Sequence, residues 1–122
     1  MTLEEFKEKE NCNILIIEND IKRVQVFQDI FNKHKITFAT TTLSALEKVD
    51  KTNFDLVCLD FDINMGKSDQ FVHEILSNNK LEGSKFLIHS MNKDGAKLLA
   101  DLLLGKRTVE VYPFNKIGDT DA

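Results

Sequence analysis

One segment, Phe54-Asp55-Leu56-Val57-Cys58-Leu59-Asp60-Phe61-Asp62, combines an almost continuous apolar run with two carboxylates at its end. Such a run is typical of a strand buried on both faces, as in a parallel sheet. Open α/β sheets bind their ligands where these strands end. Carboxylates are hard oxygen ligands, so Asp60 and Asp62 indicate a Mg²⁺-dependent phosphate site.

A second acidic group, Glu18-Asn19-Asp20, follows another apolar run at residues 14–17. Each group could simply cap the helix that comes next, because Asp and Asn are favoured at helix N-caps. Two such groups at the ends of neighbouring strands favour a functional site instead.

The composition narrows the class of protein. The chain has 122 residues, enough for one domain, and 42% of them are hydrophobic. No apolar run approaches the roughly 18 residues of a membrane span, and the charged first ten residues do not resemble a signal peptide. Cys12 and Cys58 lack metal-type spacing, so we expect reduced thiols and a cytoplasmic location. The net charge of −4, without a basic stripe, argues against broad nucleic-acid binding.

Two hydrophobic periodicities alternate along the chain. Apolar runs predict strands at 14–17, 36–40, 54–59, 86–88 and 109–111. Helical spacing fills the segments between them, with Thr41 or Thr42, and Ser68, as candidate N-caps. This alternation predicts an α/β fold with a doubly wound five-stranded parallel sheet of order 2-1-3-4-5, flavodoxin-like and lacking the fifth helix. The order places the first and third strands side by side, so the two acidic groups should meet.

The domain is expected to span residues 13–114, with an extension at 1–12 that could be helical and a flexible tail at 115–122. The tail is too short and polar for a closing helix, so strands three to five should be partly bare on one face, which the opening segment could cover only in part through Leu3 and Phe6. The fourth helix is also apolar on more than one stripe, at Leu98, Leu99 and residues 102–104. These surfaces predict a homodimer.

The chain resembles a receiver domain of the response-regulator kind over residues 13–114. Asp60 matches the phospho-accepting aspartate, Glu18 and Asn19 match the acidic pair, and Ser90 matches the hydroxyl residue after the fourth strand. Pro113-Phe114 resembles the end of the Lys-Pro-Phe motif, but Tyr112 stands in the place of the lysine. Tyrosine cannot supply the positive charge that contacts the acyl phosphate in this family.

A narrower resemblance is to the cyclic-phosphate-processing receivers. The motifs that carry it are Leu-Asp-x-Asp at 59–62, His89-Ser90-Met91-Asn92, and Gly95-Ala96. Phe61 replaces the histidine of the Leu-Asp-His-Asp pattern. This resemblance implies the processing of a cyclic phosphate ester.

The candidate metal ligands are Glu18, Asp20, Asp60 and Asp62, with Mg²⁺ or another divalent ion as cofactor. Asp60 could also act as a nucleophile on phosphorus. Asp20 could equally be an N-cap of the following helix, and Asp62 would offer only its backbone carbonyl in a plain receiver.

A second group of candidates lies at the end of the fourth strand. Ser90 and Asn92 should form a cradle for phosphate oxygens, with Gly95 allowing close approach to the backbone, although Asn92 could also be an N-cap. His89 is a candidate general acid or base, or a structural histidine, since strand alternation points it away from Ser90.

The leading hypothesis is therefore a cytoplasmic receiver-like domain that hydrolyses a cyclic phosphate ester with a divalent metal. One alternative is a signalling domain phosphorylated on Asp60, and another is a pseudo-receiver that only binds. The expected partners are a small phosphate ester and a second copy of the chain, with neither a membrane nor broad nucleic-acid binding.

Overall fold

The computed structural model describes residues 2–117, in which strands and helices alternate along the chain. In order, the elements are α1 (Thr2–Glu8), β1 (Asn13–Ile17), α2 (Ile21–Ile30), β2 (Lys35–Ala39), α3 (Thr42–Lys51), β3 (Leu56–Leu59), β4 (Asp62–Ile63), β5 (Gly66–Lys67), α4 (Asp69–Ser77), β6 (Lys85–Ile88), α5 (Lys93–Leu103), β7 (Thr108–Val111) and α6 (Phe114–Ile117).

Five of the strands form one parallel sheet, in the order β2-β1-β3-β6-β7. This arrangement confirms the predicted flavodoxin-like order and the pairing of the first and third strands. The two-residue strands β4 and β5 form a separate antiparallel hairpin after β3, in a segment that was expected to be a loop.

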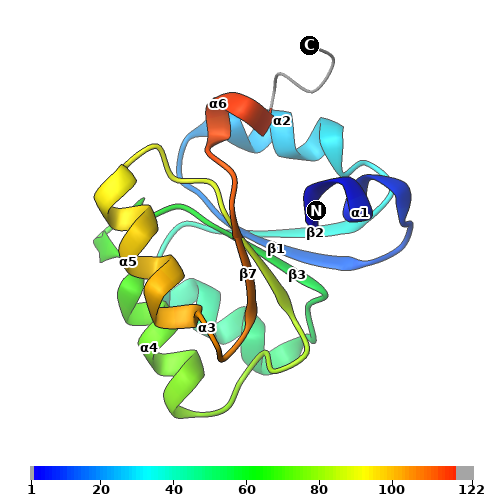
Figure 1. Ribbon diagram of the computed structural model, residues 1–122. Coiled ribbons are helices and arrows are strands. Elements are labelled where there is room, and N and C mark those ends of the chain that lie inside the picture. Colours follow the sequence, from blue (N-terminus) through cyan, green and yellow to red (C-terminus); the bar gives the residue numbers. More distant parts are fainter. Residues whose placement is uncertain (1, 118–122) are drawn as a thin grey trace.

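Helices cover both faces of the sheet (Figure 1). Helices α3, α4 and α5 lie on one face, and α1, α2 and α6 lie on the other. Strand residues alternate between the two cores: Leu15 and Ile17 pack with the α3–α5 layer, whereas Ile14 and Ile16 pack with the α1–α2–α6 layer. This alternation fixes which side chains point toward α2 at the end of each strand.

The ends of the chain correct two expectations. Leu3 and Phe6 of α1 are buried, and α6 buries Ile117, so the sheet face that was expected to be bare is covered. Residues 115–117 of the expected flexible tail therefore belong to a packed helical turn. The rest of that tail, 118–122, lies outside the described residues.

Capping residues set where the helices begin. Asp20 caps α2, Thr41 is the one of the two candidate threonines that caps α3, and Asn92 caps α5. Ser68 precedes α4, but its hydroxyl accepts no hydrogen bond from the helix amides and instead donates to the Asp60 carbonyl. Within residues 2–117, no helix has the length and apolar character that a membrane crossing requires.

Candidate functional site

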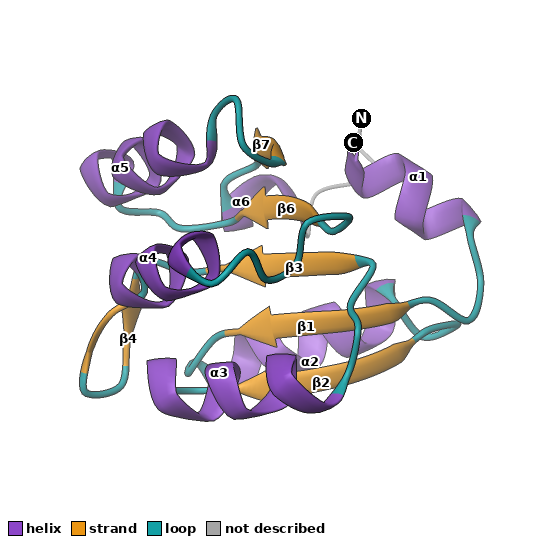
Figure 2. Ribbon diagram, turned by 90° about the horizontal axis from the view of Figure 1, so that it is seen from below, coloured by secondary structure: helices purple, strands orange, loops and turns teal. Residues whose placement is uncertain are grey.

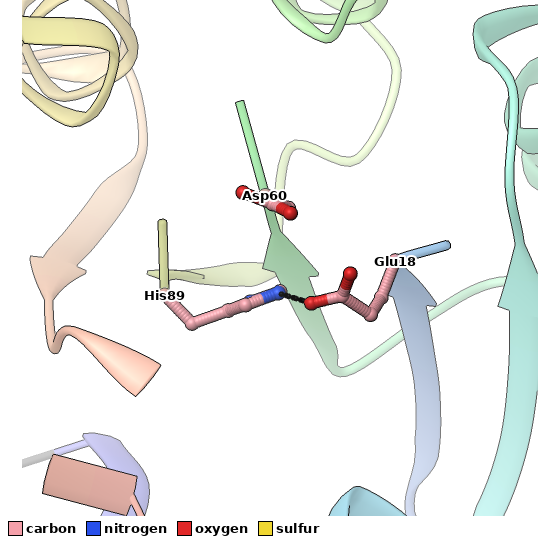
Figure 3. A group of neighbouring side chains, drawn as sticks. All are labelled: Glu18, Asp60 and His89. Carbon is pink, nitrogen blue, oxygen red and sulfur yellow. Dashed lines mark hydrogen bonds and ion pairs between the residues drawn. The ribbon is translucent and has the colours of Figure 1, made fainter. Parts of the chain in front are cut away.

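Three titratable side chains lie next to one another in a row where three neighbouring strands of the sheet end. Ile17, Leu59 and Ile88 pair across β1, β3 and β6, and the next residue of each strand is Glu18, Asp60 or His89. Their ligand atoms lie within 4.8 Å of one another (Figure 3). The two acidic groups thus meet at the sheet edge, as the strand order predicts.

Glu18 is fully buried and held on both carboxylate oxygens. Its Oε2 accepts hydrogen bonds from the Asn19 and Asp20 amides at 2.9 and 3.0 Å, and its Oε1 lies 3.0 Å from His89 Nε2. Burial by itself would raise the pKa of Glu18, but the His89 hydrogen bond and charge, the Asp20 amide and Arg23 together lower it. Glu18 is therefore stabilised as a carboxylate.

Asp60 lies between Glu18 and His89 and is anchored through its backbone. Its amide donates to the Ile17 carbonyl at 3.1 Å, and its own carbonyl accepts from Ser68 Oγ at 2.6 Å. Burial raises the pKa of the Asp60 carboxyl, and the Glu18 carboxylate raises it further, against the opposing effects of His89, Ser90 and Arg23. Two close carboxylates in this position favour a bound proton or a bound cation.

A solvent-facing cavity of about 290 Å³ opens over this row. Its lining residues are Glu18, Asn19, Asp20, Arg23, Asp60, Asp62, Ser90, Met91 and Asn92. Most of the predicted site residues are therefore brought together around one space.

Asp20 and Asp62 stand at the exposed rim of this cavity. Asp20 Oδ1 caps α2 by accepting from the amides of Lys22 and Arg23, so the residue is an N-cap and a cavity residue at once. Asp62 is paired with the Lys67 ammonium and lies 3.4 Å from Asn92 Nδ2, and these two contacts lower its pKa.

Ser90 and Asn92 line the same cavity. Ser90 Oγ accepts from the Asn92 amide at 3.1 Å, and a hydrogen bond from Ser90 lowers the pKa of Asp60. Asn92 Oδ1 accepts from the Gly95 amide at 3.0 Å, which leaves the Nδ2 donors of Asn92 near the rim. Both side chains are placed to meet an anion in the cavity.

The predicted role of Gly95 needs correction. Gly95 is buried beneath the ring of Phe61, and a Cβ built at Gly95 would lie 2.3 Å from two atoms of that ring. A neighbouring side chain, and not a ligand, therefore occupies the space that the absent Cβ leaves. Gly95 does not line the cavity.

His89 lies under the cavity and not in it. Its ring is fully buried, with edge contacts to Phe27 at 4.8 Å and to Phe114 at 6.5 Å between ring centroids. Its Nδ1 has no hydrogen-bond partner within residues 2–117. Direct proton transfer to a ligand by His89 is not supported by this placement, because the ring contacts the site only through the carboxylates.

Sequence reasoning missed Arg23. Its Nη1 lies 3.7 Å from Glu18 Oε1 and 3.7 Å from Asp60 Oδ2. The available signal was its place in the first turn of the helix that follows Glu18-Asn19-Asp20, because that turn starts at the sheet edge where the acidic groups meet.

The donor set fits a divalent cation. Glu18 and Asp60 provide buried carboxylate oxygens side by side, and Asp20 adds another carboxylate at the rim. Mg²⁺ prefers such oxygens and retains several waters, through which Asp20 could be reached. Burial and the repulsion from Glu18 raise the pKa of Asp60, and a cation bound by both carboxylates would relieve that repulsion.

Solved structures of response regulators are similar to this chain. The phosphorylated cyanobacterial phytochrome response regulator RcpA matches with a TM-score of 0.72 and 15% identity, covering 90% of this chain and 88% of that chain. TrrA from Thermotoga maritima, solved with Mg²⁺ and beryllium fluoride, matches with a TM-score of 0.65 and 17% identity, covering 89% and 95%. A two-component response regulator from Clostridium difficile matches with a TM-score of 0.66 and 21% identity, covering 84% of each chain.

This chain has the receiver fold. Neither a protein-family model nor a curated protein sequence matches this chain. The structural likeness therefore establishes the receiver fold alone, and the narrower resemblance to cyclic-phosphate-processing receivers stays a prediction.

Proposed function

We propose that this domain accepts a phosphoryl group on Asp60 and works as a signalling receiver. The observation that supports the proposal is the placement of the Asp60 carboxylate beside Glu18, in an open cavity that also contains the Ser90 hydroxyl. The structures of RcpA, described as phosphorylated, and of TrrA, with Mg²⁺ and beryllium fluoride, share this fold.

In the proposed reaction, an Asp60 carboxylate oxygen attacks the phosphorus of a small phosphodonor such as acetyl phosphate. The bond from phosphorus to the leaving acetate breaks with its electron pair, and an acyl phosphate forms on Asp60. Glu18, Asp20 and Asp60 would hold the divalent cation, which when bound neutralises charge on the carboxylates and on the phosphoryl oxygens.

The remaining polar residues would orient the phosphoryl group. The Ser90 hydroxyl and the Asn92 amide face the cavity and can donate to its oxygens. His89 would act as a positioning residue, because it orients Glu18 from the buried side.

The test is labelling by acetyl phosphate in the presence of Mg²⁺, followed by intact mass spectrometry. We expect a single phosphoryl adduct in the wild-type chain and none in the Asp60→Asn variant. Asp55→Asn is the matched control, because Asp55 precedes β3 whereas Asp60 follows it, at the other end of the strand. An adduct that persists in Asp60→Asn, or a wild-type chain that is never labelled, would contradict the proposal.

Hydrolysis of a cyclic phosphate ester is the second candidate, and it is favoured by one observation. Tyr112 follows Val111, which pairs with Ile88, so an uncharged residue stands beside His89 where receivers carry their lysine. The same metal and phosphate ligands would serve this reaction. Turnover of 2′,3′- or 3′,5′-cyclic phosphates with added metal, lost in Asp60→Asn, would support it, and no turnover across that panel would count against it.

A further inference from the structure

Because Tyr112 is not a lysine, the segment after β7 places no lysine beside Glu18, Asp60 and His89. One positively charged side chain on helix α2, that of Arg23, nevertheless lies close to Glu18 and Asp60. The structure assigns to Arg23 of α2 the binding of phosphoryl oxygens in this site. This inference rests on the proposed function, since it concerns the ligand of the same cavity.

Arg23 is placed against both acidic side chains without being bound tightly to either. The two distances of 3.7 Å from its Nη1 to Glu18 and Asp60 exceed the 2.7–3.2 Å of an N–H···O hydrogen bond. Its side chain is 27% exposed and lines the cavity. The guanidinium is therefore held by charge at the edge of the space, with N–H donors that neither carboxylate binds closely.

The position of the guanidinium is set by aromatic packing. Arg23 Cζ lies 4.9 Å from the centre of the Phe114 ring, which itself packs edge-on against Phe27. The Phe114 amide donates to the His89 carbonyl at 2.9 Å, so the ring is anchored where β6 ends. The segment after β7 thus supports the cation through Phe114, although Tyr112 supplies no charge itself.

The neighbouring lysines do not supply a positive charge to the lining of this cavity. Of the described residues that line the cavity, Arg23 alone is basic. Lys67 is paired with Asp62 at the rim and lies 5.6 Å from the Phe61 ring. Lys93 lines a different cavity, between α5 and the segment after β7.

Arginine also has the chemistry that the binding of a phosphoryl group requires. Its guanidinium stays charged and presents a planar fork of donors that matches two phosphoryl oxygens at once. When a phosphoryl group is attached to Asp60, these donors lie on the same side as its new negative charge.

The experiment compares two ligands, Mg²⁺ alone and beryllium fluoride added with Mg²⁺, by isothermal titration calorimetry. We expect Arg23→Gln to weaken the binding of beryllium fluoride by roughly tenfold to a hundredfold, the range for a charge-assisted hydrogen-bonded pair. Binding of Mg²⁺ alone should be unchanged or tighter, because a positive charge beside the carboxylates is removed. Arg23→Lys should recover part of the loss, and Lys22→Gln, an exposed change in the same helical turn, should have no effect.

The outcomes separate this inference from the proposed function. If the wild-type chain binds both ligands and Arg23→Gln binds beryllium fluoride within twofold of it, the role of Arg23 is overturned and the phospho-acceptor proposal stands. Equal losses of Mg²⁺ and beryllium fluoride in Arg23→Gln and Arg23→Lys would assign Arg23 a structural role and also overturn the inference. A wild-type chain that binds neither ligand overturns both proposals.

Discussion

Glu18 and Asp60 are neighbours in one row of the sheet, yet their environments move their pKa values in opposite directions. Both are buried, but Glu18 has the His89 ring and two backbone amides as donors, whereas Asp60 faces the negative charge of Glu18. Of the two carboxyls, Asp60 is therefore the one whose negative charge destabilises the protein when no cation is bound. A bound cation or phosphoryl group should lower the free-energy cost of charge at Asp60 more than at Glu18.

The first prediction concerns Asp60→Asn in the absence of divalent cations. The substitution keeps the shape of the side chain and removes a charge that burial and Glu18 disfavour. We expect the free energy of unfolding at neutral pH to rise by about 1 kcal/mol, measured by urea denaturation with a chelator present. Saturating Mg²⁺ should stabilise the wild-type chain more than this variant, because the variant lacks one of the ligands.

The pH dependence of this difference has a definite sign. A carboxyl whose pKa is raised on folding destabilises the native state while it is ionised, and that cost disappears as the pH falls through the raised pKa toward the ordinary value of 3.8. The advantage of Asp60→Asn should thus shrink on acidification. Glu18 works the other way, since its lowered pKa stabilises the fold above 4.5, but it is present in both proteins. An advantage that grows on acidification would contradict this account.

The alternation of side chains along the strands is enough to predict which residues of this site face α2. Ile16, Cys58 and Leu87 face α2, so the residues two further along, Glu18, Asp60 and His89, face it as well. The alternation that turns His89 away from Ser90 is the same alternation that turns it toward Glu18. Arg23 could not be placed in this way, because its contact with the row depends on how α2 lies over the sheet.

At the scale of elements, Phe61, the residue before the β4–β5 hairpin, packs against Gly95 and so joins the start of this hairpin to helix α5. The Ser68 amide donates to the Phe61 carbonyl at 2.9 Å, which fixes the segment between Asp60 and α4. The sequence pattern predicts a loop here because two-residue strands have no measurable periodicity. Spacing likewise predicts ligand approach at Gly95, because it does not reveal that the Phe61 ring faces this glycine.

The second prediction tests that contact. In Gly95→Ala, the new Cβ would lie 2.3 Å from Phe61 Cγ and Cδ2 and 2.8 Å from its Cβ, so rotation of the ring alone cannot relieve the clash. We expect a loss of about 1–3 kcal/mol in the free energy of unfolding, although alanine is otherwise favoured in helices. Gly83→Ala is the control, because nothing lies within 4 Å of the position of its Cβ.

A double variant, Phe61→Ala with Gly95→Ala, tests whether the clash with the ring causes this loss of stability. Phe61→Ala removes the ring, so adding Gly95→Ala to it should cost little or even stabilise α5 through helix propensity. If Gly95→Ala is equally destabilising with and without Phe61, the clash is not the reason that glycine occupies this position.

At the scale of the whole molecule, short terminal helices complete one face of the sheet. Helix α1 packs beside β6, and α6 adds the fully buried Ile117 to the same face (Figure 2). This face is therefore covered without a second subunit. These helices are the hardest part of the fold to anticipate, since each offers only two apolar residues. One of the two reasons for expecting a homodimer is therefore removed.

The other reason remains, since apolar side chains are exposed on and around α5. Leu98 is 42% exposed, Leu104 72% and Val111 44%, and of these three residues Val111 lines a cavity of about 530 Å³ between α5 and the segment after β7. The third prediction is that the chain forms a homodimer through the exposed apolar residues on and around α5, because burying them against a second copy would stabilise the dimer. Light scattering at high micromolar concentration should give the mass of a dimer.

The matched variants are Leu98→Glu and Leu43→Glu. Leu98 lies on α5, whereas Leu43, 68% exposed, lies on α3 at the other end of the sheet. A carboxylate at residue 98 would be buried twice in a symmetric interface, so Leu98→Glu should be monomeric while Leu43→Glu remains dimeric. A monomeric wild-type chain, or dissociation by Leu43→Glu and not by Leu98→Glu, would show that α5 does not form the interface.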